Sequence, residues 1–248
     1  MKVKSILVSQ PQPTNESSPY FSLGEKQKVQ VDFRPFIHVE GLSAKDIRQQ
    51  KIDLSKYNAI VLTSRNAVDH FFRIAQEMRF NVPDAMKYFC QSEAVAYYLQ
   101  KYIVYRKRKV YIGGKSFTDL KPILKKHKNL NFLVPSSDTL KPDVIKVMND
   151  EKLNWKRAIM YQTVSSDLSD LNDVEYDILV FFSPSGIKSL FENFPEFKQK
   201  NIKIAAFGKS TVTAAKEKGL KIDIAVPTPE TPSMAMALEK YIKANNKK

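Results

Sequence analysis

The clearest signal for the fold comes from one segment, Asp177-Ile178-Leu179-Val180-Phe181-Phe182-Ser183-Pro184-Ser185-Gly186. Its apolar run, residues 178–182, predicts a strand buried on both faces, as parallel strands in α/β proteins are. Ser183, Pro184 and Ser185 end the strand, and the apolar residues after them recur at helical spacing. The segment therefore predicts a strand, a short hydroxyl-rich loop and a helix whose first backbone N–H groups are free.

The same pattern occurs earlier in the chain, in residues 57–72, at an offset of 119 (176 minus 57) without a gap. Four residues of that segment, Tyr57, Val61, Ser64 and Phe72, recur as Tyr176, Val180, Ser183 and Phe191. A second similarity relates Phe89-Cys90-Gln91-Ser92 to Phe207-Gly208-Lys209-Ser210. The chain is therefore predicted to be internally duplicated.

Strand and helix patterns alternate along the rest of the chain. Strands are predicted at residues 4–8, 110–112, 202–207 and 222–226, and helices from Ser18-Pro19, from Ser92, at 118–124, at 210–218 and from Thr231-Pro232. Residues 29–39, which include Pro35, are predicted to form an extended connector because proline cannot donate to a sheet, and residues 155–164 match them. The alternation predicts an α/β fold with parallel sheets covered on both faces.

The composition sets limits on the class of protein. The 248 residues are enough for two domains of ordinary size. No apolar run approaches the roughly 20 residues that span a bilayer, and the N-terminal segment turns polar at Ser9-Gln10, too early for a signal peptide. The single cysteine, Cys90, excludes an internal disulfide, which is consistent with a reducing cytoplasm.

The charge balance favours an anionic partner. Lys and Arg number 40 against 26 Asp and Glu, a net charge of +14, which suits nucleic acid, phosphates or polycarboxylates. The basic runs at residues 106–109 and 125–128 lie near predicted helix ends, where solvated cations complement the helix dipole. They lack the interleaved aromatic residues of a single-strand binder, so we expect no nucleic acid as partner. The shortness of the apolar runs predicts no membrane partner.

Hydroxyl-rich loops follow several of the predicted strands. Ligands of open α/β sheets bind at the carboxyl ends of the strands, where helix N-termini attract anions. The candidate loops are Thr63-Ser64-Arg65, Ser136-Ser137, Ser183-Pro184-Ser185, Gly208-Lys209-Ser210-Thr211 and Thr228-Pro229-Glu230-Thr231. Any single hydroxyl could simply cap a helix, but their recurrence at matched places favours an anion-binding function.

Several kinds of site are excluded or not expected. The Gly-Lys-Ser triplets at residues 114–116 and 208–210 lack the earlier glycine of a phosphate-binding loop, since Lys109 and Lys203 stand there. The histidines His38, His70 and His127 lack metal-like spacing and are interpreted as surface or packing residues. No serine lies in a nucleophile-elbow pattern. The sequence therefore predicts no metal, no cofactor and no covalent nucleophile.

Four motifs together carry a resemblance to a known family. They are Tyr161-Gln162-Thr163-Val164, Phe182-Ser183-Pro184-Ser185-Gly186, Phe207-Gly208-Lys209-Ser210-Thr211 and Pro227-Thr228-Pro229-Glu230. In this order and spacing the chain resembles the uroporphyrinogen-III synthase family over almost its whole length. The resemblance implies two flavodoxin-like parallel-sheet domains joined by a two-stranded connector. Residues 1–34 with 166–248 would form one domain and 40–158 the other, with 35–39 and 159–165 as paired connectors, whereas sequence alone would divide the chain into consecutive halves.

The resemblance also implies an activity. Family members are cyclising lyases that convert hydroxymethylbilane, a linear tetrapyrrole, to uroporphyrinogen III with loss of water and inversion of ring D, in a cleft between the domains. Tyr161 would face this cleft and assist departure of the hydroxyl. The implied substrate-binding residues are Thr63, Ser64, Ser136, Ser183, Ser185, Gly208, Lys209, Ser210, Thr211 and Thr228. A cytoplasmic monomer without cofactor is expected, with hand-over of substrate from hydroxymethylbilane synthase.

The chain departs from the family pattern in two loops. Ser9-Gln10 stands where the family often has Thr-Arg, and residues 90–93 stand where it usually has Gly and Thr. Tyr161 could be a structural aromatic residue of the connector. Two other functions stay open: a noncatalytic two-domain binder of small polyanions, and a basic nucleic-acid-binding protein.

Overall fold

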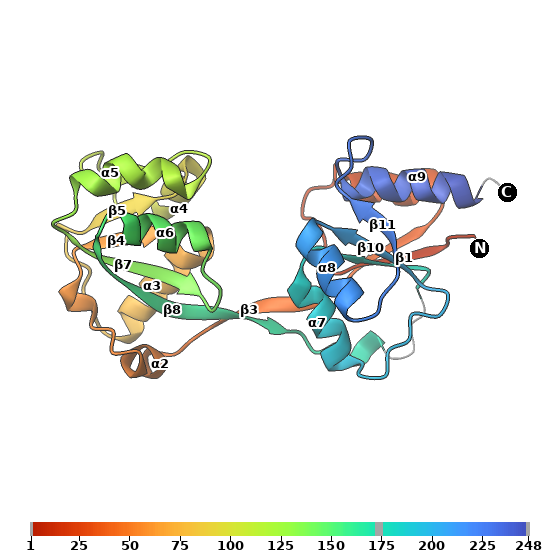
Figure 1. Ribbon diagram of the computed structural model, residues 1–248, viewed down its shortest axis with the longest axis horizontal. Helices are drawn as coiled ribbons and strands as arrows, with labels where there is room; N and C mark the ends of the chain where they lie inside the picture. The colour runs from red at the N-terminus through yellow and green to blue at the C-terminus, as the bar shows by residue number, and fades with distance from the viewer. Residues whose placement is uncertain (1, 172–175, 247–248) are drawn as a thin grey trace. The chain divides into compact units, whose positions relative to one another are not determined.

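The computed structural model describes residues 2–171 and 176–246. It divides into two compact units: unit 1 is Met1–His38 with Val164–Lys248, and unit 2 is Val39–Thr163 (Figure 1). Both units are built on sheets whose neighbouring strands are mainly parallel. The predicted α/β fold class is therefore confirmed.

Within the described residues, unit 1 contains a five-stranded sheet in the order β11-β10-β9-β1-β2. The strands are β1 (Ser5–Val8), β2 (Gln30–Phe33), β9 (Ile178–Phe181), β10 (Lys203–Phe207) and β11 (Ile222–Val226), and every neighbouring pair is parallel. In chain order this is the 2-1-3-4-5 arrangement of flavodoxin-like folds. The order reverses between β1 and β9, the place where such folds bind ligands.

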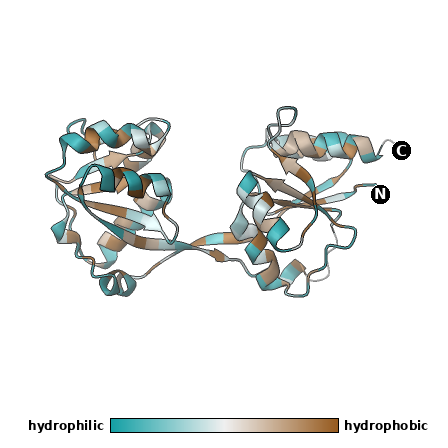
Figure 2. Ribbon diagram, in the orientation of Figure 1, coloured by the Kyte–Doolittle hydropathy of each residue, from teal (hydrophilic) through white to brown (hydrophobic). Residues whose placement is uncertain are grey.

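Helices cover both faces of this sheet. They are α1 (Pro19–Gln27) and α9 (Met234–Asn246) on one face, and α7 (Pro184–Asn193) and α8 (Lys209–Glu217) on the other, with the short 3₁₀ helix η3 at Ser169–Leu171 (Figure 1). Side chains of β1 alternate between the two layers: Ile6 and Val8 pack with α1 and α9, and Leu7 packs with α7 and α8. Burial on both faces explains the continuous apolar runs, which are brown in Figure 2.

The sheet of unit 2 has the order β3-β8-β7-β4-β5-β6 within the described residues. Its strands are β3 (Ile37–Gly41), β4 (Ala59–Leu62), β5 (Lys87–Cys90), β6 (Val110–Ile112), β7 (Asn131–Ser137) and β8 (Asn154–Ser165). Its helices are α2 (Ala44–Gln49), α3 (Arg65–Glu77), α4 (Glu93–Leu99), α5 (Lys121–Lys126) and α6 (Pro142–Asp150), with 3₁₀ helices η1 (Leu54–Lys56) and η2 (Phe117–Leu120). Strands β8-β7-β4-β5-β6 again have the flavodoxin-like order 2-1-3-4-5. Here, however, β4, which occupies position 3 of that order, comes first of these five strands in the chain, and β7 and β8, which occupy positions 1 and 2, come last.

The repeated segments occupy equivalent places in the two units. The offset of 119 superimposes β4 on β9, and it places Ser64 and Ser183 at the same position, the N-cap of the following helix. The second similarity is shifted. Ser92 occupies the N-cap position of α4, whereas Gly208 occupies that of α8 and Ser210 is the second residue of the helix. Gly208 has a φ of 86°, a backbone conformation that glycine adopts without strain, so it can connect β10 directly to α8.

Three sequence predictions differ from the structure. Residues 29–39 are not one connector, because β2 pairs in parallel with β1 before Pro35. Residues 155–164 belong to β8, a strand paired in parallel with β7. The final helix begins after Ser233, whose Oγ accepts the Met236 N–H at 3.3 Å, and not after Thr231-Pro232.

The chain crosses between the units twice. The boundaries lie between residues 38 and 39 and between residues 163 and 164. Strands β3 and β8 are neighbours in the sheet, and both continue across these boundaries. The ranges 35–39 and 159–165, which the family resemblance implied as paired connectors, overlap these two neighbouring strands.

Candidate functional site

Within each unit, the predicted loops gather at the C-terminal ends of the strands, because parallel strands all end on the same side of the sheet. In unit 1, Ser183, Gly208 and Thr228 follow β9, β10 and β11. In unit 2, Thr63 and Ser64 follow β4, and Ser136 lies near the end of the strand β7. Each unit therefore presents its hydroxyl-rich loops at the C-terminal end of its own sheet.

At the reversal point of unit 1, two serines lie around a glycine. The Ser183 hydroxyl caps α7 by accepting the Gly186 N–H at 3.2 Å. A Cβ atom at Gly186 would lie 3.7 Å from Ser183 Oγ and 3.8 Å from Ser9 Oγ. Ser185 lies in the first turn of α7. Ser9, which the sequence indicated only as a departure from the family pattern, therefore lies beside the predicted Ser183 loop.

The loop before α8 presents a helix N-terminus with a cation. Gly208 is the N-cap, and Lys209 and Ser210 are exposed in the first turn. Thr211 is only 1% exposed, so its side chain belongs to the packing of α8 rather than to its surface. The exposed part of this loop can attract an anion through the helix N-terminus and the Lys209 ammonium group.

The Thr228 hydroxyl is used within its own turn. Its Oγ1 lies 2.6 Å from Thr231 Oγ1 and accepts the Thr231 N–H at 3.0 Å. Glu230 beside it forms an ion pair with Lys240. Thr228 is exposed, but these bonds give it a structural task in addition to the predicted one.

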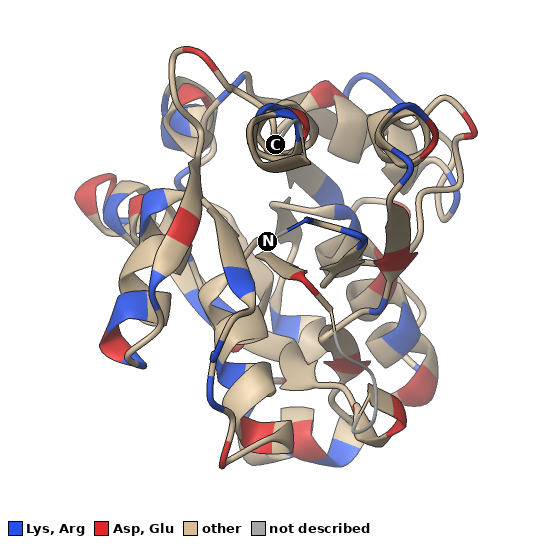
Figure 3. Ribbon diagram, turned by 90° about the vertical axis from the view of Figure 1, so that its right-hand side faces the viewer, with Lys and Arg blue, Asp and Glu red and all other residues tan. Residues whose placement is uncertain are grey.

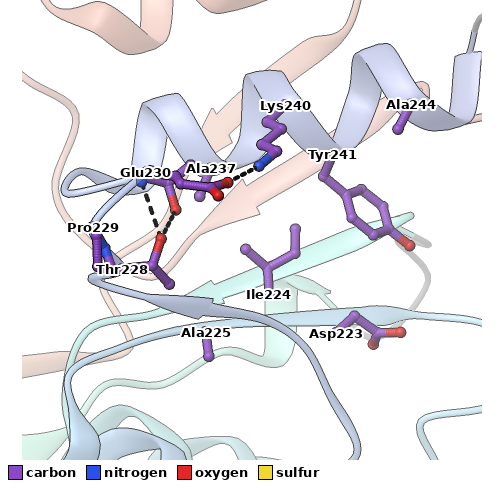
Figure 4. A pocket seen from close by; sticks show the side chains of 11 residues that line it. Asp223, Ile224, Ala225, Thr228, Pro229, Glu230, Ala237, Lys240, Tyr241 and Ala244 are labelled. Atoms are coloured by element: carbon purple, nitrogen blue, oxygen red, sulfur yellow. Dashed lines mark hydrogen bonds and ion pairs between the residues drawn. The ribbon is translucent and has the colours of Figure 1, made fainter.

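A groove of about 590 Å³ lies between β11 and α9 (Figure 4). Its lining includes Thr228 and the carboxylates of Asp223 and Glu230, together with Tyr241 and Lys240. It runs along an edge strand and contains no other predicted substrate residue. Two carboxylates make it a poor match for a polyanion, so we do not assign the substrate to this groove.

A β-bulge determines where Tyr161 points. Ser136 pairs with Ile159, but Ser137 pairs with Tyr161, so β8 contains one extra residue. Ala158 and Met160 face the core cluster that includes α3, and the bulge turns Tyr161 to the same cluster instead of the opposite face. Tyr161 is consequently 7% exposed and belongs to unit 2.

Two predicted residues meet here. The Tyr161 hydroxyl lies 3.3 Å from the Ser64 hydroxyl, and Ser64 Oγ also caps α3 by accepting the Ala67 N–H at 3.1 Å. The His70 ring, further along α3, stacks on the Tyr161 ring with centroids 4.7 Å apart and an angle of 16°. Sequence reasoning missed this role of His70, because the residues between Ser64 and His70 give no sign that a strand from elsewhere in the chain lies against them.

Arg73 ties this part of α3 to the neighbouring backbone. Its Nη2 donates to the carbonyl oxygens of Leu42 at 2.7 Å and Met160 at 3.2 Å, and its Nη1 pairs with Glu77. A Cβ atom at Gly41 would lie 2.6 Å from Nη2, so glycine there leaves room for the guanidinium. Arg73 therefore links α3 to the residue that precedes Tyr161.

Arg157 holds the strand on the other side of the bulge. Its Nε donates to Ser136 Oγ at 2.9 Å, and its Nη2 donates to the carbonyl oxygens of Ser137 and Asp138, each at 2.7 Å. Ser136 is 2% exposed and its hydroxyl is occupied by these bonds. These bonds give Ser136 a structural role, and its predicted contact with substrate stays a prediction.

Burial raises the pKa of Tyr161, and hydrogen bonds with the Ser64 side chain and the Ser137 backbone oppose that rise. The ordinary pKa of tyrosine is already about 10. The phenol is therefore protonated near neutral pH and can act as a hydrogen-bond or proton donor.

Two further observations concern the described residues only. No group of three His, Cys, Asp or Glu side chains in residues 2–171 and 176–246 is arranged to hold a metal ion. Among the helices of the same residues, none has the length and apolar character needed to cross a bilayer.

The fold and these loops define a class of α/β enzymes and binding proteins with flavodoxin-like sheets and polar strand-end loops. The family model described as Uroporphyrinogen-III synthase HemD matches residues 19–236. The chain belongs to the uroporphyrinogen-III synthase family, whose members are cyclising lyases of tetrapyrrole biosynthesis. The family resemblance inferred from the four motifs is confirmed.

Solved structures agree on the fold. The chain is similar to uroporphyrinogen-III synthetase from Helicobacter pylori, with 18% identity and a TM-score of 0.60 over 97% of this chain and 99% of that one. It is also similar to a mutant uroporphyrinogen III synthase from the extremely thermophilic bacterium Thermus thermophilus, with 14% identity and a TM-score of 0.52 over 99% and 100% of the two chains. No curated protein matches the sequence. The alternative of a noncatalytic polyanion binder has no support in these comparisons.

Proposed function

We propose that this chain closes hydroxymethylbilane to uroporphyrinogen III with Tyr161 as the donor to the departing hydroxyl. The observation that carries the role of Tyr161 is its geometry: a phenol kept protonated by burial, with its hydroxyl 3.3 Å from the Ser64 hydroxyl at the start of α3. General acids of this kind contribute about 10²- to 10⁴-fold to a rate.

The proton and electron balance of this step is simple. The C–O bond of the terminal hydroxymethyl group breaks and its oxygen takes the Tyr161 proton. Water departs, and an azafulvenium cation and the Tyr161 phenolate remain. Ring D attacks this cation through its substituted carbon and forms a spiro intermediate. The bond from that carbon to its original bridge carbon then breaks, and the bridge carbon closes onto the unsubstituted ring carbon, which leaves ring D inverted. The ring carbon that closes the macrocycle finally loses a proton, which restores the phenol. Tyr161 therefore supports both ends of the reaction without a cofactor.

The carboxylates of the substrate require anion-binding groups. We assign them to the accessible part of the predicted loops, in particular Ser183, Ser185, Lys209 and Ser210 in unit 1 and Thr63 in unit 2. Helix N-termini and hydroxyls at strand ends suit carboxylates. Lys and Arg are distributed over helices and loops, interspersed with Asp and Glu (Figure 3), and the net charge of +14 favours encounter with a polyanion.

A product analysis tests the activity. The protein is supplied with enzymatically generated hydroxymethylbilane, the products are oxidised, and type I and type III uroporphyrins are resolved by chromatography. Uncatalysed closure occurs without inversion, so an excess of type III that depends on this protein supports the proposal. Type I alone, from folded protein beside a working synthase, contradicts it.

The cellular setting is also part of the proposal. We propose a cytoplasmic monomer that receives its short-lived substrate from hydroxymethylbilane synthase. The functional division into 1–34 with 166–248, 40–158 and the connectors 35–39 and 159–165 likewise stays a proposal. Gel filtration with light scattering, alone and with that synthase, measures the oligomeric state and the hand-over complex.

A further inference from the structure

His70 touches the face of the Tyr161 ring, while Ser64 touches its hydroxyl. The two rings are nearly parallel, at 16°, with centroids 4.7 Å apart. Both contacts come from one short stretch of structure, since Ser64 caps α3 and His70 lies within it. The phenol is therefore held at its polar end and across its apolar face by the same helix.

The His70 ring is itself held in place. Arg73 Nε donates to His70 Nδ1 at 3.2 Å, and Arg73 Nη2 is fixed by the carbonyl oxygens of Leu42 and Met160. An arginine has no acceptor, so Nδ1 accepts this bond and the imidazole is neutral, with its proton on Nε2. The neutral ring gives Tyr161 an uncharged aromatic surface instead of a second cation beside Arg73.

We propose that His70 is a positioning residue for the cyclisation, which orients the Tyr161 phenol by stacking on its ring. The proposal rests on the role proposed for Tyr161. It adds a residue that touches no substrate and acts only by fixing the angle at which the phenol donates. Small misplacements of a catalytic group are expensive, since about 1 Å can cost 10²-fold in rate.

Two substitutions separate stacking from the link to Arg73. His70→Gln keeps an acceptor for Arg73 Nε but removes the ring, so we expect kcat for type III formation to fall about tenfold with KM changed less than about twofold. His70→Phe keeps a ring and removes the acceptor, so we expect it to retain kcat within about threefold of the unsubstituted protein. Equal kcat in His70→Gln and the unsubstituted protein overturns the proposal.

A double-mutant cycle shows whether His70 acts through Tyr161. In a Tyr161→Phe background, His70→Gln is expected to cost less than about twofold in kcat, because the donor that it positions is already absent. The same tenfold loss in both backgrounds overturns the proposal and indicates general damage. Far-UV circular dichroism and urea unfolding establish whether each variant is folded. If His70→Gln is unfolded, His70→Phe provides the test, because a loss of kcat greater than about threefold in that folded variant contradicts a stacking role.

His127→Gln is a matched control. His127 belongs to the same unit and lies against a tyrosine ring, with 4.5 Å between the centroids of His127 and Tyr111, but it has no place in the site. Its kcat is expected to stay within about twofold of the unsubstituted protein. If the unsubstituted protein forms no type III product, the proposed function fails. If it does, and Tyr161→Phe loses kcat while His70→Gln keeps the kcat of the unsubstituted protein, only the positioning role fails.

Discussion

At the scale of the residue, the proposed chemistry depends on where the Tyr161 phenol points. Sequence reasoning selected Tyr161 from its motif and Ser64 from its loop, and the structure brings the two hydroxyls within 3.3 Å. The bulge in β8, opposite Ser136 and Ser137, turns Tyr161 toward α3 and could not be predicted, because an inserted residue is not visible in the apolar pattern. For the same reason the contacts of His70 were beyond prediction.

Tyr161→Phe removes the proposed donor and keeps the ring. We expect kcat to fall about 10²-fold or more, with KM nearly unchanged, because the hydroxyl acts on the leaving group and not on binding. Steady-state kinetics of type III formation measures this. Tyr111→Phe, which removes a hydroxyl bonded to the Arg108 carbonyl oxygen in the same unit, serves as the control. Equal activity of the two variants contradicts the assignment of Tyr161.

The pH dependence of stability reports on His70. Burial lowers the pKa of His70, and the charge of Arg73 lowers it further. The ordinary pKa is about 6.5, so between the two values the unfolded chain binds more protons than the folded one. The contribution of His70 to the free energy of unfolding is therefore complete above about pH 6.5 and falls as the pH drops through the lowered pKa.

His70→Gln is expected to lose this part of the dependence. Urea unfolding from about pH 7.5 to pH 5 compares the two proteins, and the unsubstituted protein should lose more stability toward acid. Burial also lowers the pKa of His127, but His127 is present in both proteins and its effect cancels. Parallel curves for the two proteins would show that His70 is not held neutral.

At the scale of the element, the repeated strand-loop-helix is used in two ways. Ser64 and Ser183 occupy equivalent caps, each accepting the N–H three residues ahead, at 3.1 and 3.2 Å. Of the two, Ser64 also contacts a tyrosine hydroxyl. The repeat and its caps were predictable from hydroxyl positions and apolar spacing. The roles of Arg157 and Arg73 were not, because long side chains reach backbone groups that only the folded chain brings near.

Alanine at these two serines provides a matched pair. Each substitution removes one cap and should lower the free energy of unfolding by about 1 kcal/mol. Ser64→Ala should in addition lower kcat several-fold because Tyr161 loses its partner, whereas Ser183→Ala should act mainly on KM. Urea unfolding and steady-state kinetics measure both effects. A loss of kcat in Ser183→Ala equal to that in Ser64→Ala would contradict the division of roles.

At the scale of the whole molecule, the two units have the same strand order but different continuity. Unit 2 is one uninterrupted segment, whereas unit 1 is assembled from both ends of the chain. Sequence alone would have divided the chain into consecutive halves. The repeat does not indicate that, of the five strands in the shared order, unit 2 begins with β4, the strand in position 3. The order of strands along the chain does not indicate which sheet the first strand joins. The discontinuous division was therefore expected only from the family resemblance.

Fragments test the independence of unit 2. Residues 39–163 contain their own apolar clusters on both faces of the sheet and are expected to fold alone, with a cooperative urea transition. Residues 164–248 alone should not, because β1 normally lies between β9 and β2. Adding residues 1–38 as a peptide should restore the transition. Cooperative unfolding of 164–248 without that peptide would contradict the expectation.

The pairing of β1 with β9 also has a consequence for the order of events during synthesis. Ile6 pairs with Ile178, so the first strand remains without this neighbour while 172 further residues (178 minus 6) are added. At roughly 5–20 residues per second this interval lasts about 9–34 seconds. Unit 2 is synthesised completely within it. Unit 2 can therefore fold first, while β1 waits for its neighbour β9 until much later in translation.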